Sequence, residues 1–234
     1  MRILLKLSGE QLAGDNPRSF DLERAKWIAA EIKKARDVGA EIVVIVGGGN
    51  VIRGKDFVES KLVRRVSADY MGMLSGVINT LGLAEVFNNS DLPTAALSNI
   101  QADQVIDQYT YRRALNHLAK GRVVLVAGGM ARPYFSHDTV AVNVALELDC
   151  DLVLKATKVD GVFNKDPEKF ADAVKLNEIS LADAVANGEI KVMDKAALGL
   201  AAEFAKPIVV FELLKEGNIA KIASGSREIG TFIE

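Results

Sequence analysis

Short apolar runs alternate along this 234-residue chain with longer stretches in which apolar residues recur at helical spacing. The clearest run is 42–46, five consecutive β-branched residues, which is typical of a strand buried on both faces. Further runs predict strands at 3–7, 122–127, 152–157 and 207–211, with weaker ones at 95–100 and near the carboxyl end. Glycines follow two of these strands, at 47–49 and 128–129, and leave the backbone bare where the chain turns.

The stretches between the strands predict helices. The first begins after Asp21, a good N-cap, and ends at Gly39. Others are expected at 66–87, 110–120, 138–148, 194–205 and 218–223, with a short one after Ser180, and Asp138 and Asp194 stand at N-cap positions. Alternating strands and helices favour an α/β fold with a mainly parallel central sheet and helices on both faces. No linker divides the chain, so we expect a single domain over 1–234.

Composition indicates a folded protein and argues against nucleic acid and membrane as its partners. Apolar residues make up 49% and charged residues 26%, which allows a full core. A net charge of −2 argues against a general nucleic-acid binder. The longest apolar run, 70–87, contains Asn79 and Glu85, so we expect a buried or interface helix there and no membrane span.

The chain has one cysteine, Cys150, which allows no internal disulfide and suits a reducing cytoplasm. Its neighbours Asp149 and Asp151 should raise the thiol pKa and make a nucleophilic role unfavourable. We therefore expect a cytoplasmic protein that binds neither nucleic acid nor membrane.

Four predicted strand ends carry lysines or glycines: 6–9, 47–50, 128–129 and 155–158. Parallel strands would bring these ends to one edge of the sheet, where ligands bind in open α/β folds. Bare backbone N–H groups, two lysines and Arg53 suit phosphate oxygens. Together they predict one nucleotide-sized, phosphate-rich cleft.

The standard phosphate motifs do not fit. A dinucleotide fingerprint starting at Gly47 would need glycine where Ile52 stands, and residues 49–55 resemble a P-loop except that Asp56 replaces its Ser or Thr. No Ser–His–Asp arrangement or cluster with metal-ligand spacing is apparent, so any metal would be Mg²⁺ arriving with a nucleotide.

Charged residues in apolar surroundings are the next candidates, each with a plainer interpretation. Lys6 and Lys155 lie in apolar strands, where an ammonium must either reach a partner at the strand end or extend to solvent. Asp138, Asp160, Asp166 and Asp194 fall at element ends, where capping a helix is the ordinary role of aspartate.

Five segments taken together carry a specific resemblance: residues 6–10, 47–54, 68–74, 155–162 and 191–194. In this order they resemble bacterial-type uridylate kinases of the amino acid kinase superfamily, and the similarity spans essentially the whole chain. The stretches Asp-Tyr-Met-Gly-Met at 69–73 and Lys-Ala-Thr-Lys-Val-Asp-Gly at 155–161 are more specific than any glycine loop.

The resemblance implies phosphoryl transfer from ATP to UMP, with Mg²⁺ carried by ATP, in pyrimidine nucleotide biosynthesis. It implies a three-layer αβα sandwich whose N-terminal part binds UMP and whose part from about 150 binds ATP. The implied ATP-binding residues are Lys6, Leu7, Ser8, Gly9, Gly49, Arg53, Thr157, Phe163 and Asp166. The implied UMP-binding residues are Gly48, Asp69, Met130, Ala131, Arg132, Pro133, Tyr134, Phe135, Ser136 and His137. Catalysis is assigned to Lys6, Arg53, Asp138, Lys155, Lys158 and Asp194, with the second lysine open between Lys155 and Lys158. Relatives are typically hexamers, so we expect a homo-oligomer.

One loop departs from the family pattern. Relatives usually read Thr-Gly-Asn-Pro-Phe-Phe-Thr-Thr-Asp, whereas residues 130–138 here read Met-Ala-Arg-Pro-Tyr-Phe-Ser-His-Asp. We favour a variant that still uses UMP over one with an altered acceptor. Two other possibilities stay open: a superfamily enzyme that phosphorylates a carboxylate, against which residues 69–73 argue, and a catalytically weak nucleotide-sensing regulator.

Overall fold

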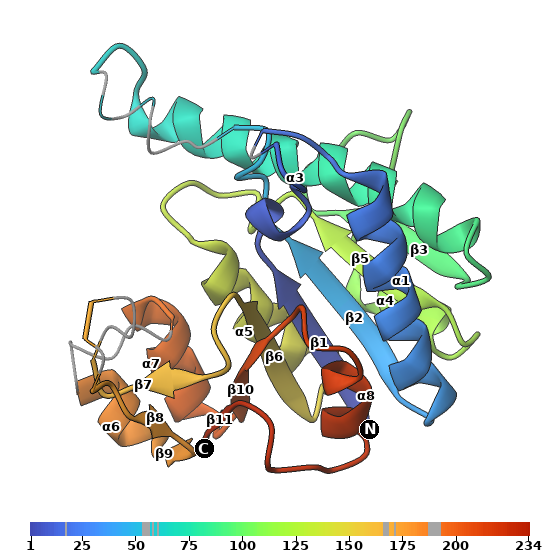
Figure 1. The fold of residues 1–234 in the computed structure, drawn as a ribbon. Helices are drawn as coiled ribbons and strands as arrows, with labels where there is room; N and C mark the ends of the chain where they lie inside the picture. Colours follow the sequence, from blue (N-terminus) through green and yellow to red (C-terminus); the bar gives the residue numbers. More distant parts are fainter. Residues whose placement is uncertain are drawn as a thin grey trace.

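A computed structural model describes residues 1–16, 18–52, 57, 59, 61–165, 169–170, 172–186 and 193–234. Within these residues a nine-stranded sheet runs through the molecule in the order β4-β3-β5-β2-β1-β6-β10-β11-β9 (Figure 1). Its strands are β1 (Arg2–Leu7), β2 (Glu41–Val46), β3 (Thr94–Ser98), β4 (Asp107–Gln108), β5 (Val123–Ala127), β6 (Leu152–Thr157), β9 (Glu178–Ile179), β10 (Ile208–Glu212) and β11 (Thr231–Ile233). All neighbours are parallel except β10 and β11. A separate antiparallel pair joins β7 (Val162–Phe163) to β8 (Lys175–Leu176).

Helices cover both faces of the sheet (Figure 1). One layer contains α1 (Leu22–Asp37), α3 (Arg65–Asn88) and α8 (Asn218–Ala223); the other contains α4 (Tyr111–Leu118), α5 (His137–Glu147), α6 (Leu181–Ala186) and α7 (Lys195–Glu203). Side chains alternate along β1, so Ile3 and Leu5 pack beneath α1 while Leu4 joins the cluster beneath α5. This arrangement confirms the predicted αβα sandwich with its mainly parallel sheet.

Helix starts follow the predicted caps with one exception. Asp21 accepts a hydrogen bond from the backbone N–H of Arg24, and Asp194 caps α7 in the same way. Thr110, predicted only as the start of a helix, caps α4. The prediction that Asp138 caps α5 is wrong, because the Ser136 hydroxyl accepts from the N–H groups of residues 138 and 139. Asp138 therefore lies in the first turn, and its carboxylate is available for another role.

Helix α3 has the length and apolarity of a membrane span, as the one described helix that passes that test on composition. Its inner face nevertheless packs on the sheet through Leu83, Ala84 and Phe87, which belong to the main core. The buried inner face agrees with the predicted buried or interface helix at this point. Its outer face exposes Tyr70, Leu74 and Ile78.

The strand pairing brings the predicted functional ends together. Leu7 at the end of β1 pairs with Val46 of β2, and Ile45 pairs with Val126 of β5. On the other side of β1, Lys6 pairs with Lys155 of β6. All four strand ends thus lie along one edge of the sheet, as predicted.

Candidate active site

Two lysines lie side by side at this edge. Lys6 and Lys155 are register partners on neighbouring parallel strands. Side-chain alternation places both on the face that Leu4 and Val153 present to α5. Two ammonium groups that are mostly withdrawn from water repel each other, so this register is favourable only with a negative charge between them.

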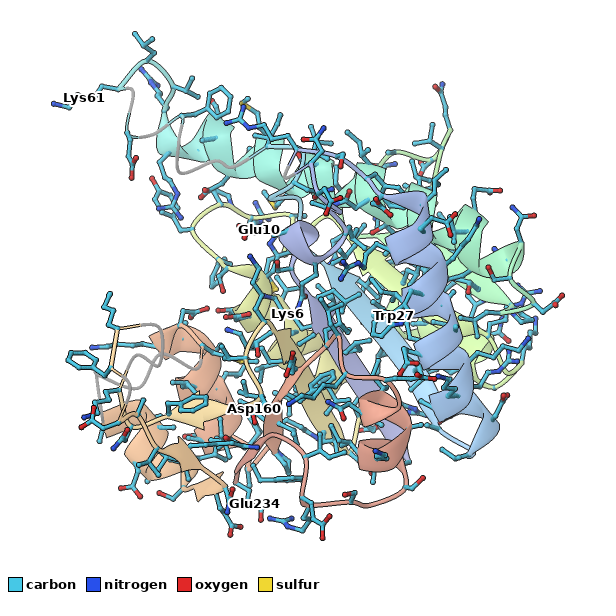
Figure 2. All side chains as sticks on the ribbon, viewed as in Figure 1. Lys6, Glu10, Trp27, Lys61, Asp160 and Glu234 are labelled. Carbon is cyan, nitrogen blue, oxygen red and sulfur yellow. The ribbon has the colours of Figure 1, made fainter. Side chains whose placement is uncertain are left out.

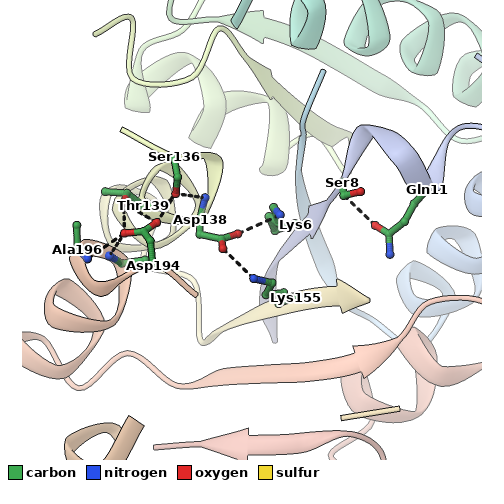
Figure 3. A network of polar contacts seen from close by, with 10 residues as sticks. Lys6, Ser8, Gln11, Ser136, Asp138, Thr139, Lys155, Asp194 and Ala196 are labelled. Carbon is green, nitrogen blue, oxygen red and sulfur yellow. Dashed lines mark hydrogen bonds and ion pairs between the residues drawn. The ribbon is translucent and has the colours of Figure 1, made fainter. Parts of the chain in front are cut away.

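Asp138 supplies that charge from the first turn of α5 (Figure 3). Lys155 Nζ donates to Asp138 Oδ2 at 2.8 Å. Lys6 Nζ forms an ion pair with Asp138 Oδ1 at 3.0 Å. The helix N-terminus also favours a carboxylate at this position. Asp138 thus holds both lysine head groups at the end of the sheet.

The electrostatics of the three side chains are set by burial and by one another. Burial by itself would raise the pKa of Asp138, but the charges of Lys6 and Lys155 outweigh it and hold that pKa below its usual range. Burial lowers the pKa of Lys155, Asp138 opposes this shift, and Lys6 adds to it. With Asp138 ionised between two ammonium groups, the cluster has a net positive charge that suits a phosphoryl group.

Lys158, the alternative second lysine, lies elsewhere. It is exposed beyond the end of β6 and lines a separate groove of about 400 Å³ with Glu10, Arg24 and Leu214. Thr157 at the same strand end donates to the backbone carbonyl of Val159 at 2.6 Å. The structure therefore places Lys155, and not Lys158, beside Lys6 and Asp138.

A cleft of about 600 Å³ opens next to Lys6, whose position at the centre of the molecule is labelled in Figure 2. It is lined by predicted phosphate and acceptor residues: Lys6, Ser8, Gly9, Gly48, Gly49, Asp69, Phe135, Ser136 and His137. The glycines are required by close approach. A Cβ on Gly48 would lie 2.7 Å from the Gly72 carbonyl oxygen of α3, and one on Gly9 would lie 2.6 Å from the Gly49 nitrogen.

Asp69 on α3 holds the loop that precedes α5. Its Oδ2 accepts from the backbone N–H of Tyr134 at 2.8 Å, and its Oδ1 accepts from Arg65 Nε at 2.6 Å. The Arg65 guanidinium also lies over the Tyr134 ring, 5.4 Å from its centroid. Tyr134 and Ala131 have φ values of 71° and 52°, a conformation that side chains disfavour. The loop is therefore held in a strained shape by contacts across the cleft.

Arg65 was not predicted as a site residue, although it lines the cleft and orients Asp69. The available signal was a pair of opposite charges four residues apart, at the start of the helix predicted over 66–87. Its second contact, with Tyr134, could not be read from sequence because it joins segments far apart in the chain.

Ser136 and Asp194 join α5 to α7 (Figure 3). The Ser136 hydroxyl donates to Asp194 Oδ2, and Thr139 Oγ1 donates to Asp194 Oδ1 at 3.1 Å. Asp194 also accepts from the backbone N–H groups of Ala196 and Ala197. With both oxygens engaged, Asp194 positions the start of α5 and lies outside the residues that line the cleft.

The remaining predicted residues differ in their exposure. The Leu7 side chain is in the core, so only its backbone is available to a ligand. Met130 packs against the core cluster that lies beneath α5. Arg132, Tyr134 and Phe135 are exposed, Pro133 and Ala131 are half-buried, and Phe163 lies in β7. Arg53 and Asp166 lie outside the described residues.

The described residues contain no group of three His, Cys, Asp or Glu side chains placed to hold a metal ion. The thiol of Cys150 is buried, and burial is the main reason that its pKa is raised to about 12. Asp149 and Asp151, which the sequence suggested as the cause, contribute less.

The chain is similar to known proteins over its whole length. The model of the Amino acid kinase family matches residues 1–212. The uridylate kinase of Wolinella succinogenes is 43% identical over 232 residues, which cover 99% of this chain and 96% of that protein. The crystal structure of UMP kinase from Bacillus anthracis superimposes with a TM-score of 0.94 at 35% identity, covering 100% of this chain and 95% of that one. UMP kinase from Ureaplasma parvum gives 0.92 at 28% identity, with 100% and 98% covered.

His137 lies beneath the cleft with its Nε2 buried and without a hydrogen-bond partner among the described residues. Burial, assisted by the charge of Lys6 and opposed by Asp138, lowers its pKa from 6.5 to about 4. The folded protein therefore resists protonation of this ring, whereas the unfolded chain accepts a proton near pH 6.5.

This difference predicts a stability loss in acid. As pH falls from 6.5 towards 4, the unfolded state binds more protons, so His137 should reduce the free energy of unfolding by about 1.5 kcal/mol between pH 6.5 and 5. Urea unfolding at the two pH values should show this loss in the wild type and a correspondingly smaller loss in His137→Asn. Equal pH dependence of the two proteins would contradict it.

Proposed function

This chain belongs to the amino acid kinase family, and from that membership we propose that it is a UMP kinase that transfers the γ-phosphoryl group of ATP to UMP. The observation that carries the proposal is the pair of lysines held by Asp138 beside the glycine-lined cleft. Such a cluster offers positive charge where two polyanionic substrates must approach each other.

The proposed reaction needs little acid–base chemistry. An oxygen of the UMP phosphate attacks the γ-phosphorus, a new P–O bond forms, and the bond to ADP breaks. The acceptor oxygen is already ionised, so Asp138 has no proton to remove, and its ion pairs support a role in holding Lys6 and Lys155 in place. The lysines then neutralise charge on the transferring group, and the glycine loops supply backbone N–H groups.

We place UMP in the 600 Å³ cleft. Its phosphate would lie near Gly48 and Gly49, and its ribose near Asp69 on α3. The loop over 130–137 would cover the base. Two exposed aromatic side chains of this loop, Tyr134 and Phe135, are available to contact it. To bind ribose, Asp69 would exchange its hydrogen bond from Tyr134, so the loop would adjust when UMP enters.

We place ATP along the ends of β1 and β6, with Ser8, Gly9, Thr157 and Phe163 as contacts. Arg53 and Asp166 remain proposals from the family pattern. Asp138 and Asp194 have their oxygens engaged by the protein, which suits Mg²⁺ bound mainly through the phosphates of ATP. When bound there, Mg²⁺ would neutralise phosphate charge.

We also propose that the protein is cytoplasmic and forms a homo-oligomer, with a hexamer as the expected form. Its single, buried cysteine supports a reducing compartment. An exposed apolar stripe on α3, at Val66, Tyr70, Leu74 and Ile78, supports self-association through that helix.

A coupled assay of ADP release tests the function. With ATP and Mg²⁺, turnover is expected with UMP and should exceed that with CMP, dUMP, AMP, aspartate or acetylglutamate. Turnover with an amino acid instead would favour a carboxylate kinase. Nucleotide binding without turnover of any acceptor would favour a regulatory protein.

Asp69→Asn should raise KM for UMP by about 10-fold or more, because ribose hydroxyls donate more strongly to a carboxylate than to an amide oxygen. KM for ATP should change by less than about two-fold, because we assign no contact with ATP to α3. Asp37→Asn, an exposed change at the end of α1, is the control. Equal effects on the two substrates would remove Asp69 from the acceptor site.

A further inference from the structure

Two fully buried asparagines join the glycine loop to α3. Asn50 follows the three glycines after β2, Asn79 lies on α3, and both side chains are 0% exposed. Asn50 Nδ2 donates to Asn79 Oδ1 at 3.1 Å, and Asn79 Nδ2 donates to Asn50 Oδ1 at 2.7 Å. This reciprocal pair spans 29 residues of sequence, and Asn50 directly follows Gly49, which lines the cleft.

Each amide also holds a backbone carbonyl. Asn79 Nδ2 donates to the Gly47 carbonyl oxygen at 2.7 Å, and Asn50 Nδ2 donates to that of Ser19 at 2.9 Å. These carbonyls fix the orientation of both amides, because turning either amide over would bring two oxygens together. Every amide hydrogen therefore has an acceptor, which makes the pair a rigid connection.

The pair also determines how closely the loop after β1 and the glycine loop after β2 approach each other. A Cβ on Gly9 would lie 2.4 Å from Asn50 Oδ1, so the Asn50 side chain lies directly against the loop after β1. The backbone N–H of Gly47 donates to the Leu7 carbonyl at 3.0 Å. Asn50 is thus packed between the loop that follows Lys6 and the loop that carries Gly48 and Gly49.

We propose that the Asn50–Asn79 pair is a positioning element that fixes the acceptor phosphate loop relative to Asp69. Asp69 and Asn79 are ten residues apart on α3, so the helix separates them by about 15 Å along its axis. α3 acts as a spacer: Asp69 near one end contacts the nucleoside, and Asn79 anchors the loop beside its phosphate. This role rests on the proposed function, because it assigns the cleft to a nucleoside monophosphate.

A purely structural role for the pair would lower stability without changing substrate binding. A positioning role should act on one substrate. Displacing the glycine loop by about 1 Å can reduce turnover by about 10²-fold when it misaligns the reacting groups. The loss of turnover should depend on UMP, whereas the proposed contacts of ATP with the end of β6 should be unaffected.

Steady-state kinetics at a temperature at which all variants are folded test the proposal. Asn79→Ala and Asn50→Ala should each lower kcat/KM for UMP by about 10²-fold. KM for ATP should stay within about two-fold of wild type in Asn79→Ala, whereas Asn50→Ala should also raise it, because Asn50 lies against Gly9 in the proposed ATP site. The double variant should be no worse than the singles, because either change breaks the pair. Asn79→Asp, which keeps the volume but places an oxygen against the Gly47 carbonyl, should be as damaging as Asn79→Ala.

Thr80→Ala is the matched control. Thr80 is also fully buried on α3, but its hydroxyl donates only within the helix, to the Gly76 carbonyl at 2.8 Å. Its kinetic constants should stay within about two-fold of wild type. Equal loss in Thr80→Ala, additive losses in the double variant, or a wild-type kcat/KM in Asn79→Asp would overturn the proposal.

Hydrogen exchange of the glycine loop gives a readout that requires no turnover. Asn79→Ala and Asn50→Ala should speed exchange of the amides at 47–50 by about 10-fold or more, and Thr80→Ala should not. If the wild type does not phosphorylate UMP, the proposed function fails while this measurement still tests the anchoring. Unchanged exchange in both asparagine variants would overturn it.

Discussion

The geometry of the site depends on one carboxylate between two cations. Strand pairing places Lys6 and Lys155 on the same face of neighbouring strands, and Asp138 contacts both ammonium groups within 3.0 Å. Without that carboxylate, two like charges withdrawn from water would destabilise the end of the sheet. The start of α5 is arranged for this contact, because Ser136 takes over the capping and Asp194 holds Ser136.

The second constraint is close packing against α3. Glycine at 48 lets the loop after β2 approach the helix, and the asparagine pair fixes it there. The same helix carries Asp69, which holds the strained loop at Tyr134. The side of the cleft that we assign to the acceptor is therefore organised by a single helix, whereas the charged cluster belongs to the sheet and α5. Phosphoryl transfer would occur where these two units meet.

The sequence predicted most elements because their signals are local. Apolar β-branched runs marked the central strands, and caps such as Asp21 marked helix starts. Strands of two residues, such as β7 and β8, were missed because two positions show no periodicity. Arg53 and Asp166 stay as predictions.

From the residue pattern alone, the site could be predicted only where functional residues lie at the ends of predicted strands. Lysines in apolar strands indicated that Lys6 and Lys155 need a partner, and the choice between Lys155 and Lys158 required the register of β1 and β6. Position alone indicated a cap at Asp138, because an aspartate at a helix start is usually a cap, and only the family resemblance assigned it to catalysis. Arg65 and the Asn50–Asn79 pair depend on contacts between distant segments, which one sequence does not reveal.

The central claim is that Asp138 holds the charge of the buried lysines, and the pKa of Lys155 measures it directly. A carbon-13 NMR titration of labelled lysines would follow this residue, with Lys155→Met to assign its signal. In the wild type the pKa should lie below 10.5, because burial outweighs the attraction of Asp138. In Asp138→Asn that attraction is lost while Lys6 remains, so the pKa should fall further. An unchanged or raised pKa in the variant would contradict the account.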